Sequence, residues 1–170
     1  MKLAFETLRV AAALLAAPVV AATLCTGFEW VSNSAWPGID PGDLSFSWAV
    51  TFIVALAHAV VLGLPAYLLL RWRGWTRWWT SLVCGFAIGS VPFAIYFSPF
   101  DNAASFSQAG DKVLIENGVT TLAGWIDFAE SVGGLGLLGM AGGIAAWLTW
   151  YGLGRVFARP RMRAGPATAG

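Results

Sequence analysis

Four long apolar stretches divide the chain, and none contains a charged side chain except Arg155 at the end of the last. They cover about residues 10–26, 46–70, 80–97 and 132–156. A helix needs about 20 mainly apolar residues to cross a hydrocarbon core about 30 Å thick. The pattern therefore predicts an all-α fold, a four-transmembrane-helix bundle that forms a single membrane domain in residues 1–158.

Two polar segments, 27–45 and 98–131, join these stretches in pairs and are expected to lie on one side of the membrane. The first contains Pro37-Gly38 and a second turn-forming stretch at 40–43, so an irregular loop is expected there. The second contains two patterns of regular structure, a hairpin and an amphipathic helix.

The hairpin is predicted from an alternating run at 112–116 that is followed by Asn117-Gly118. This pair favours a type I′ turn, and residues 119–121 then return as a second short strand. A two-stranded hairpin is marginal by itself, so it must pack on the helix ends.

The amphipathic helix begins after Thr120 or Thr121, either of which suits the N-cap position. Its apolar positions share one face, and they are Leu122, Trp125, Ile126 and Ala129. This pattern predicts a helix that lies on the outer membrane surface until the chain turns inward at Gly133-Gly134.

Basic side chains gather on one side of the predicted bundle. All of them except Lys112 flank the spans on the side that carries both termini: Lys2, Arg9, Arg71, Arg73, Arg77, Arg155, Arg159, Arg161 and Arg163. Basic residues in short flanks are retained in the cytoplasm. We therefore expect a multi-pass protein of the plasma membrane, in a bacterium its inner membrane, with both termini cytoplasmic.

The two ends of the chain carry separate expectations. The first span also has features of a signal peptide, with small residues near Ala22, but Glu6 interrupts its basic start. Retention is favoured, and cleavage stays open as an alternative. Residues 159–170 are rich in Arg, Pro, Gly and Ala, so a disordered cytoplasmic tail is predicted.

Composition narrows the class of protein. Of 170 residues, 58% are apolar and 11% charged, and the net charge is +1. Too few polar side chains are present to cover a water-soluble globule, so the lipid bilayer is the expected partner and nucleic acid is not. Two cysteines and one histidine form no metal-ligand set, so neither a metal nor another cofactor is expected.

Small residues recur at four-residue spacing in every span, as in helices that pack closely in membranes. The predicted packing positions are Gly85, Gly89, Gly139 and Gly143, together with Ala55, Ala59 and Gly63, and span one offers Ala13, Ala17 and Ala21. We call each row of small residues a seam. The seams predict a tight bundle, which forms either within one chain or partly in a homo-oligomer or with another membrane protein. Residues 134–139 match GxGxxG, but no strand precedes them, so helix packing is the better interpretation.

His58 is the only histidine and lies inside the second span, at about the depth of Cys84. An ionisable residue within a membrane is a functional hypothesis by default. The simpler interpretation is a neutral imidazole bonded to a backbone carbonyl near Cys84-Gly85 or Gly143. The alternative is a ligand-binding or proton-linked site at His58 and Cys84.

Two functions compete. The first is a non-catalytic accessory, interaction or protective module that presents its outer loops to a partner. The second is a small carrier or binding protein for an apolar or weakly polar molecule, with His58 in the pocket. An enzyme is least favoured, because no catalytic residues are predicted: the hydroxyl side chains of the loops have no histidine on their side of the membrane. A cavity that reaches His58 would favour the carrier.

Overall fold

The computed structural model describes residues 2–33, 41–99 and 106–158. In chain order its elements are α1 (Lys2–Asn33), α2 (Pro41–His58), the π-helix η1 (Ala59–Gly63), α3 (Leu64–Trp72), α4 (Trp78–Tyr96), β1 (Phe106–Ala109), β2 (Lys112–Glu116), β3 (Val119–Thr120) and α5 (Leu122–Ala158). The protein is thus mainly helical, with one small sheet.

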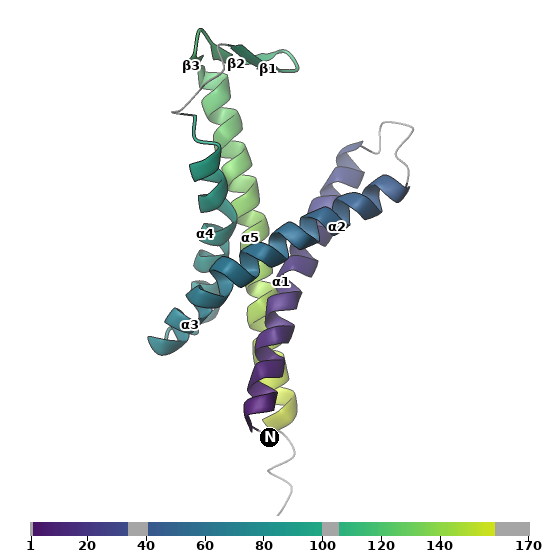
Figure 1. Cartoon of the computed structure of the whole chain (residues 1–170), viewed down its shortest axis with the longest axis vertical. Coiled ribbons are helices and arrows are strands. Elements are labelled where there is room, and N and C mark those ends of the chain that lie inside the picture. The colour runs from purple at the N-terminus through teal and green to yellow at the C-terminus, as the bar shows by residue number, and fades with distance from the viewer. Residues whose placement is uncertain (1, 34–40, 100–105, 159–170) are drawn as a thin grey trace, which may run out of the picture.

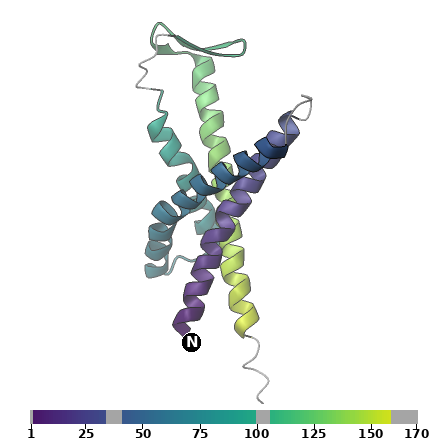
Figure 2. The ribbon, with the colours of Figure 1, turned by 45° about the vertical axis from the view of Figure 1, so that its right-hand side comes forward.

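The long helix α5 is the centre of the arrangement. Figures 1 and 2 show α4 beside its first half and α1 beside its second half, while the rod formed by α2, η1 and α3 crosses the other helices obliquely. The sheet caps the beginning of α5. The start of α1 and the end of α5 lie together at the opposite end (Figure 1).

The interior holds small side chains, and the large apolar ones face outward. Ala22 is fully buried and Pro18 is the largest fully buried side chain among the described residues, whereas Phe28, Val61, Ile95 and Leu148 are 74%, 66%, 74% and 55% exposed. Within the described ranges, four helical segments are long and apolar enough to cross a membrane: Ala4–Val31, Asp43–Trp72, Trp78–Tyr96 and Leu122–Val156. This distribution suits a protein surrounded by lipid, where helices pack through small residues.

The first two helices extend well into the segment 27–45 that was expected to be an irregular loop. α1 continues to Asn33 and α2 already begins at Pro41. A proline at the first helical position is favourable because its missing N–H has no helical partner there in any case. The predicted turn at Pro37-Gly38 and the predicted disordered tail, 159–170, lie outside the described residues.

The second predicted span, 46–70, is interrupted by a wider helical turn. In η1 the N–H of Leu64 bonds to the carbonyl of Ala59, five residues back. Pro65 follows directly, and its ring would clash with the carbonyl four residues earlier in a regular α-helix. The π turn accommodates this proline and lies immediately after His58.

The predicted hairpin is present. β2 pairs antiparallel with β3, with Ile115 opposite Thr120, and the turn residues Asn117 and Gly118 have φ of 51° and 77°, as a type I′ turn requires. A third strand, β1, pairs antiparallel with β2 and was not predicted. The resulting order is β1-β2-β3.

The prediction of a surface helix that ends at Gly133-Gly134 is wrong. α5 runs without a break through both glycines, because a helix that continues keeps its backbone groups paired in apolar surroundings. Its start is held by Thr121, whose Oγ1 accepts a bond from the N–H of Gly124 at 3.1 Å and donates to the carbonyl of Val113 at 2.6 Å. The backbone N–H of Thr121 also bonds to Leu114 at 2.9 Å. The sheet therefore sits directly on the helix.

Candidate functional site

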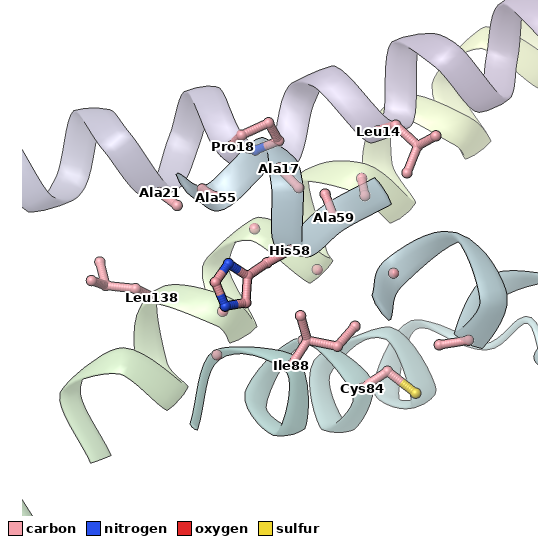
Figure 3. A pocket seen from close by; sticks show the side chains of 18 of the residues that line it. Leu14, Ala17, Pro18, Ala21, Ala55, His58, Ala59, Cys84, Ile88 and Leu138 are labelled. Atoms are coloured by element: carbon pink, nitrogen blue, oxygen red, sulfur yellow. The ribbon is translucent and has the colours of Figure 1, made fainter. Parts of the chain in front are cut away.

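A cavity of about 810 Å³ lies between the crossing rod and the other helices. All of the longer helices and η1 contribute to its wall, and we call it the central cavity (Figure 3). Among the described residues that line it, none is Asp, Glu, Lys or Arg. Its size lies within the roughly 300–1,000 Å³ of small-molecule sites.

Small residues of the second span line this space. Ala55, Ala59 and Gly63 all line the central cavity. A Cβ atom on Gly63 would be 3.9 Å from the side chain of Ile88, an ordinary contact that leaves the backbones apart. These three predicted packing positions line the cavity, as the predicted glycines of α4 and α5 also do.

The glycines of α4 and α5 lie in direct backbone contact. A Cβ atom on Gly85 would overlap the carbonyl oxygen of Gly139, and a Cβ atom on Gly139 would overlap that of Gly85. Gly89 faces the carbonyl of Leu135, and Gly143 faces that of Ser81, in the same way. The structure brings together all four predicted glycines, in a geometry suited to weak Cα–H···O contacts.

A second close approach joins α1 to α5. A Cβ atom on Gly142 would be 3.2 Å from the carbonyl oxygen of Ala17 and 3.4 Å from its Cβ. Gly142 was not singled out from the sequence, although it stands beside Gly143. Through these two neighbouring glycines α5 contacts α4 and α1 on different faces, and the central cavity lies next to this junction.

His58 projects into the central cavity from the last turn of α2, between Leu138 of α5 and Ile88 of α4 (Figure 3). Its Nδ1 is 2.8 Å from the carbonyl oxygen of Val54 on its own helix. A carbonyl only accepts, so Nδ1 is the donor of this bond, and in a neutral imidazole Nε2 would be left as an acceptor. Within the described part of the chain, Nε2 has no hydrogen-bond partner.

The backbone partner of His58 is therefore not the one expected from the sequence. The carbonyl belongs to Val54 instead of the Cys84-Gly85 or Gly143 region, because a residue four positions earlier on the same helix is always within reach. Cys84 lines the same cavity on the α4 wall, beyond Ile88 in Figure 3, and makes no hydrogen bond to His58. No group of three or more His, Cys, Asp or Glu side chains suited to a metal ion occurs among the described residues.

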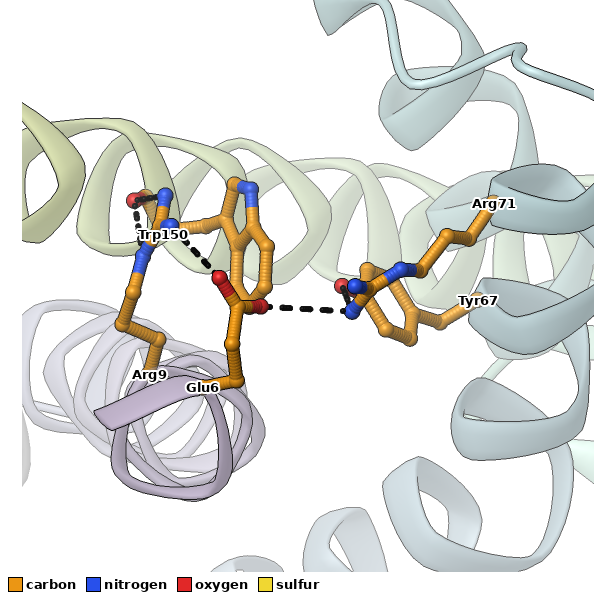
Figure 4. A network of polar contacts seen from close by, with 5 residues as sticks. All are labelled: Glu6, Arg9, Tyr67, Arg71 and Trp150. Atoms are coloured by element: carbon orange, nitrogen blue, oxygen red, sulfur yellow. Dashed lines mark hydrogen bonds and ion pairs between the residues drawn. The ribbon is translucent and has the colours of Figure 1, made fainter. Parts of the chain in front are cut away.

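A polar cluster lies next to the end of the central cavity nearest the start of α1, where Tyr67 and Trp150 line the wall. We call Glu6, Arg9, Tyr67, Arg71 and Trp150 the arginine cluster (Figure 4). The carboxylate of Glu6 lies 3.5 Å from Arg9 and 3.4 Å from Arg71, and so joins α1 to α3. Tyr67 packs edge-on against Trp150 with ring centroids 5.4 Å apart, which joins α3 to α5.

Arg9 is the most enclosed charge of the arginine cluster. Its side chain is 14% exposed, its Nε and Nη2 donate to the carbonyl of Trp150 at 3.2 and 2.7 Å, and its guanidinium lies 3.9 Å from the indole centroid. Gly154 provides the room, since a Cβ atom there would be 2.5 Å from Nη2. The sequence indicated Arg9 only as a topology signal, because its hydrogen-bond partner Trp150 lies 141 residues away, while its ion-pair partner Glu6 is local.

Comparison of the chain with models of protein families, with curated proteins and with solved structures finds no match.

Proposed function

We propose that the chain is a multi-pass protein of the plasma membrane, in a bacterium its inner membrane, with both termini in the cytoplasm. The outward-facing large apolar side chains and the four helical segments of sufficient length support this placement. Arg9, Arg71 and Arg155 lie toward the end where α1 begins and α5 ends, in accordance with cytoplasmic retention of basic flanks. The sheet would then lie outside the cell.

We propose further that the protein binds or carries a mainly apolar, uncharged molecule in the central cavity. The observation that carries the proposal is an apolar cavity into which one imidazole presents an unpartnered acceptor nitrogen. Ligand sites are typically apolar with a few polar groups that fix orientation. A ligand with one hydroxyl or N–H group would satisfy Nε2 of His58, and its chain would contact the alanines and glycines of the wall.

A photoreactive ten-carbon alcohol, carrying a diazirine beside its hydroxyl group, tests this function. The protein is placed in lipid nanodiscs and labelled residues are mapped by mass spectrometry. We expect label on residues 54–63 in the wild-type protein and its loss in His58→Leu, while Ala57→Leu, an exposed position on the same helix that does not line the cavity, keeps it. Equal labelling of the three proteins would refute a site at His58.

The second candidate is the accessory module expected from the sequence. The sheet leaves Phe106 of β1, Val119 of β3 and the neighbouring Leu122 exposed, and β1 is an edge strand that can accept another strand. Such a module needs no ligand in the central cavity. An unchanged cellular phenotype of His58→Leu, together with loss of the phenotype when β1 is altered, would favour the module over the carrier.

A further inference from the structure

A second, smaller pocket lies beneath the sheet. Its volume is about 280 Å³, and it is bounded by the end of α4, by β1 and β2, and by the first turns of α5. We call it the sheet pocket. Its polar lining residues include Ser107, Ser131 and Asp127, and Asp127 is exposed. Asp127 has no ion-pair partner among residues 2–33, 41–99 and 106–158.

The sheet pocket and the central cavity share part of their wall. Phe93 and Phe97 line both, and their ring centroids are 4.6 Å apart. Tyr96 packs against Phe97 at 4.9 Å. The two spaces are therefore neighbours, separated by a pair of aromatic rings at the end of α4.

The two spaces lie at different depths along α5, and an amphiphile likewise has a polar group that prefers water and a chain that prefers hydrocarbon. α5 has 37 residues and is about 55 Å long at 1.5 Å per residue, so it exceeds a hydrocarbon core of about 30 Å. The residues near Asp127, in the second turn of α5, therefore extend beyond the core when the rest of the helix spans it. In the proposed membrane placement the sheet pocket would lie at the level of lipid head groups, and the central cavity would lie within the hydrocarbon.

The chemistry of both spaces selects the same kind of group. His58 offers an acceptor nitrogen in the central cavity, and Asp127 offers acceptor oxygens in the sheet pocket. Among the described lining residues of the two spaces there is neither Lys nor Arg. A hydroxyl or ammonium group can bond at either place, whereas the carboxylate or phosphate of an anionic lipid would be repelled by Asp127.

We propose that the sheet pocket is a second binding site for the ligand of the central cavity, where Asp127 takes the hydroxyl or ammonium group of a single-chain amphiphile. This inference rests on the proposed carrier function. The chain of the ligand passes the Phe93–Phe97 pair, so that its polar group moves between His58 inside the membrane and Asp127 outside it. The ligand class is a long-chain alcohol, or a long-chain amine that is uncharged while it occupies the central cavity.

A matched pair of probes tests the second site. One is a ten-carbon alkylamine and the other a ten-carbon carboxylate, each with a diazirine beside its polar group, used on the full-length protein in zwitterionic nanodiscs. We expect the amine to label residues 106–131 about tenfold more than the carboxylate does, since hydrogen bonds to charged groups contribute at about this level. Asp127→Asn should lower labelling by the amine and raise labelling by the carboxylate, whereas a folding defect would lower both.

Glu130→Gln is the control, because Glu130 is an exposed carboxylate three residues later that does not line the sheet pocket. If Glu130→Gln changes the labelling as much as Asp127→Asn does, or if neither changes it, the second site is refuted. In that case the proposed function still stands if labelling of residues 54–63 in the wild-type protein depends on His58. If residues 54–63 of the wild-type protein are not labelled, the proposed function itself is refuted.

Discussion

Replacing Gly139 by alanine adds one methyl group where the structure leaves no room for it. A Cβ atom there would overlap the carbonyl oxygen of Gly85, and would lie 3.0 Å from its carbonyl carbon and 3.2 Å from Cα of Gly89. Non-bonded heavy atoms prefer about 3.5–4.0 Å, and the overlap with the oxygen is the closest contact, so α4 and α5 must separate by about 1 Å. A gap of that size removes roughly a quarter to a half of each dispersion contact along the seam. Overpacking of this kind typically costs about 1–3 kcal/mol.

Gly134→Ala is the matched control, since it lies on the same helix and nothing is within 4 Å of its added Cβ. Both substitutions gain the same helix propensity, about 1 kcal/mol, so the difference between them isolates the packing cost. In mixed micelles titrated with SDS and followed by far-UV circular dichroism, we expect Gly139→Ala to be less stable than Gly134→Ala by about 1–3 kcal/mol. Equal stability of the two variants would refute backbone contact between α4 and α5.

Two further predictions concern orientation and the arginine cluster. A reporter fused after Arg73 should be cytoplasmic and one fused near Asp111 should be outside, because the basic flanks are retained in the cytoplasm; a cytoplasmic reporter at Asp111 would contradict the four-span topology. Arg9→Leu should lower the free energy of unfolding by about 1–3 kcal/mol in the same SDS titration, because it removes two hydrogen bonds and a cation–π contact. Arg73→Leu, at an exposed loop position without an ion-pair partner among the described residues, should change it by less than about 0.5 kcal/mol.

Features that depend on neighbouring residues were predictable. The pair Asn117-Gly118 predicts its turn because both residues tolerate positive φ, and the structure has both at positive φ. The spacing of Gly139 and Gly143 predicts a helix face on which backbones can approach closely. Such patterns repeat within one or two turns, so a single sequence displays them.

Features that depend on distant residues were not predictable. The same small-residue spacing describes Gly85 and Gly89, which contact main-chain atoms of α5, and Ala55 and Ala59 of the rod that lies against α1, because spacing does not say which helix is the partner. The continuation of α5 through Gly133 was missed since glycine pairs punctuate chains in water, while lipid favours an unbroken helix.

The backbone-to-backbone seam between α4 and α5 has a consequence for how this protein can change over evolutionary time. In an interface of interlocking side chains, a large residue on one helix can be compensated by a small one opposite. Here the residues opposite Gly85 and Gly139 are main-chain atoms, and no substitution can make a main chain smaller. We expect relatives of this protein to keep very small residues at Gly85, Gly89, Gly139 and Gly143 independently of one another, while exposed positions such as Leu137 drift freely among large apolar side chains.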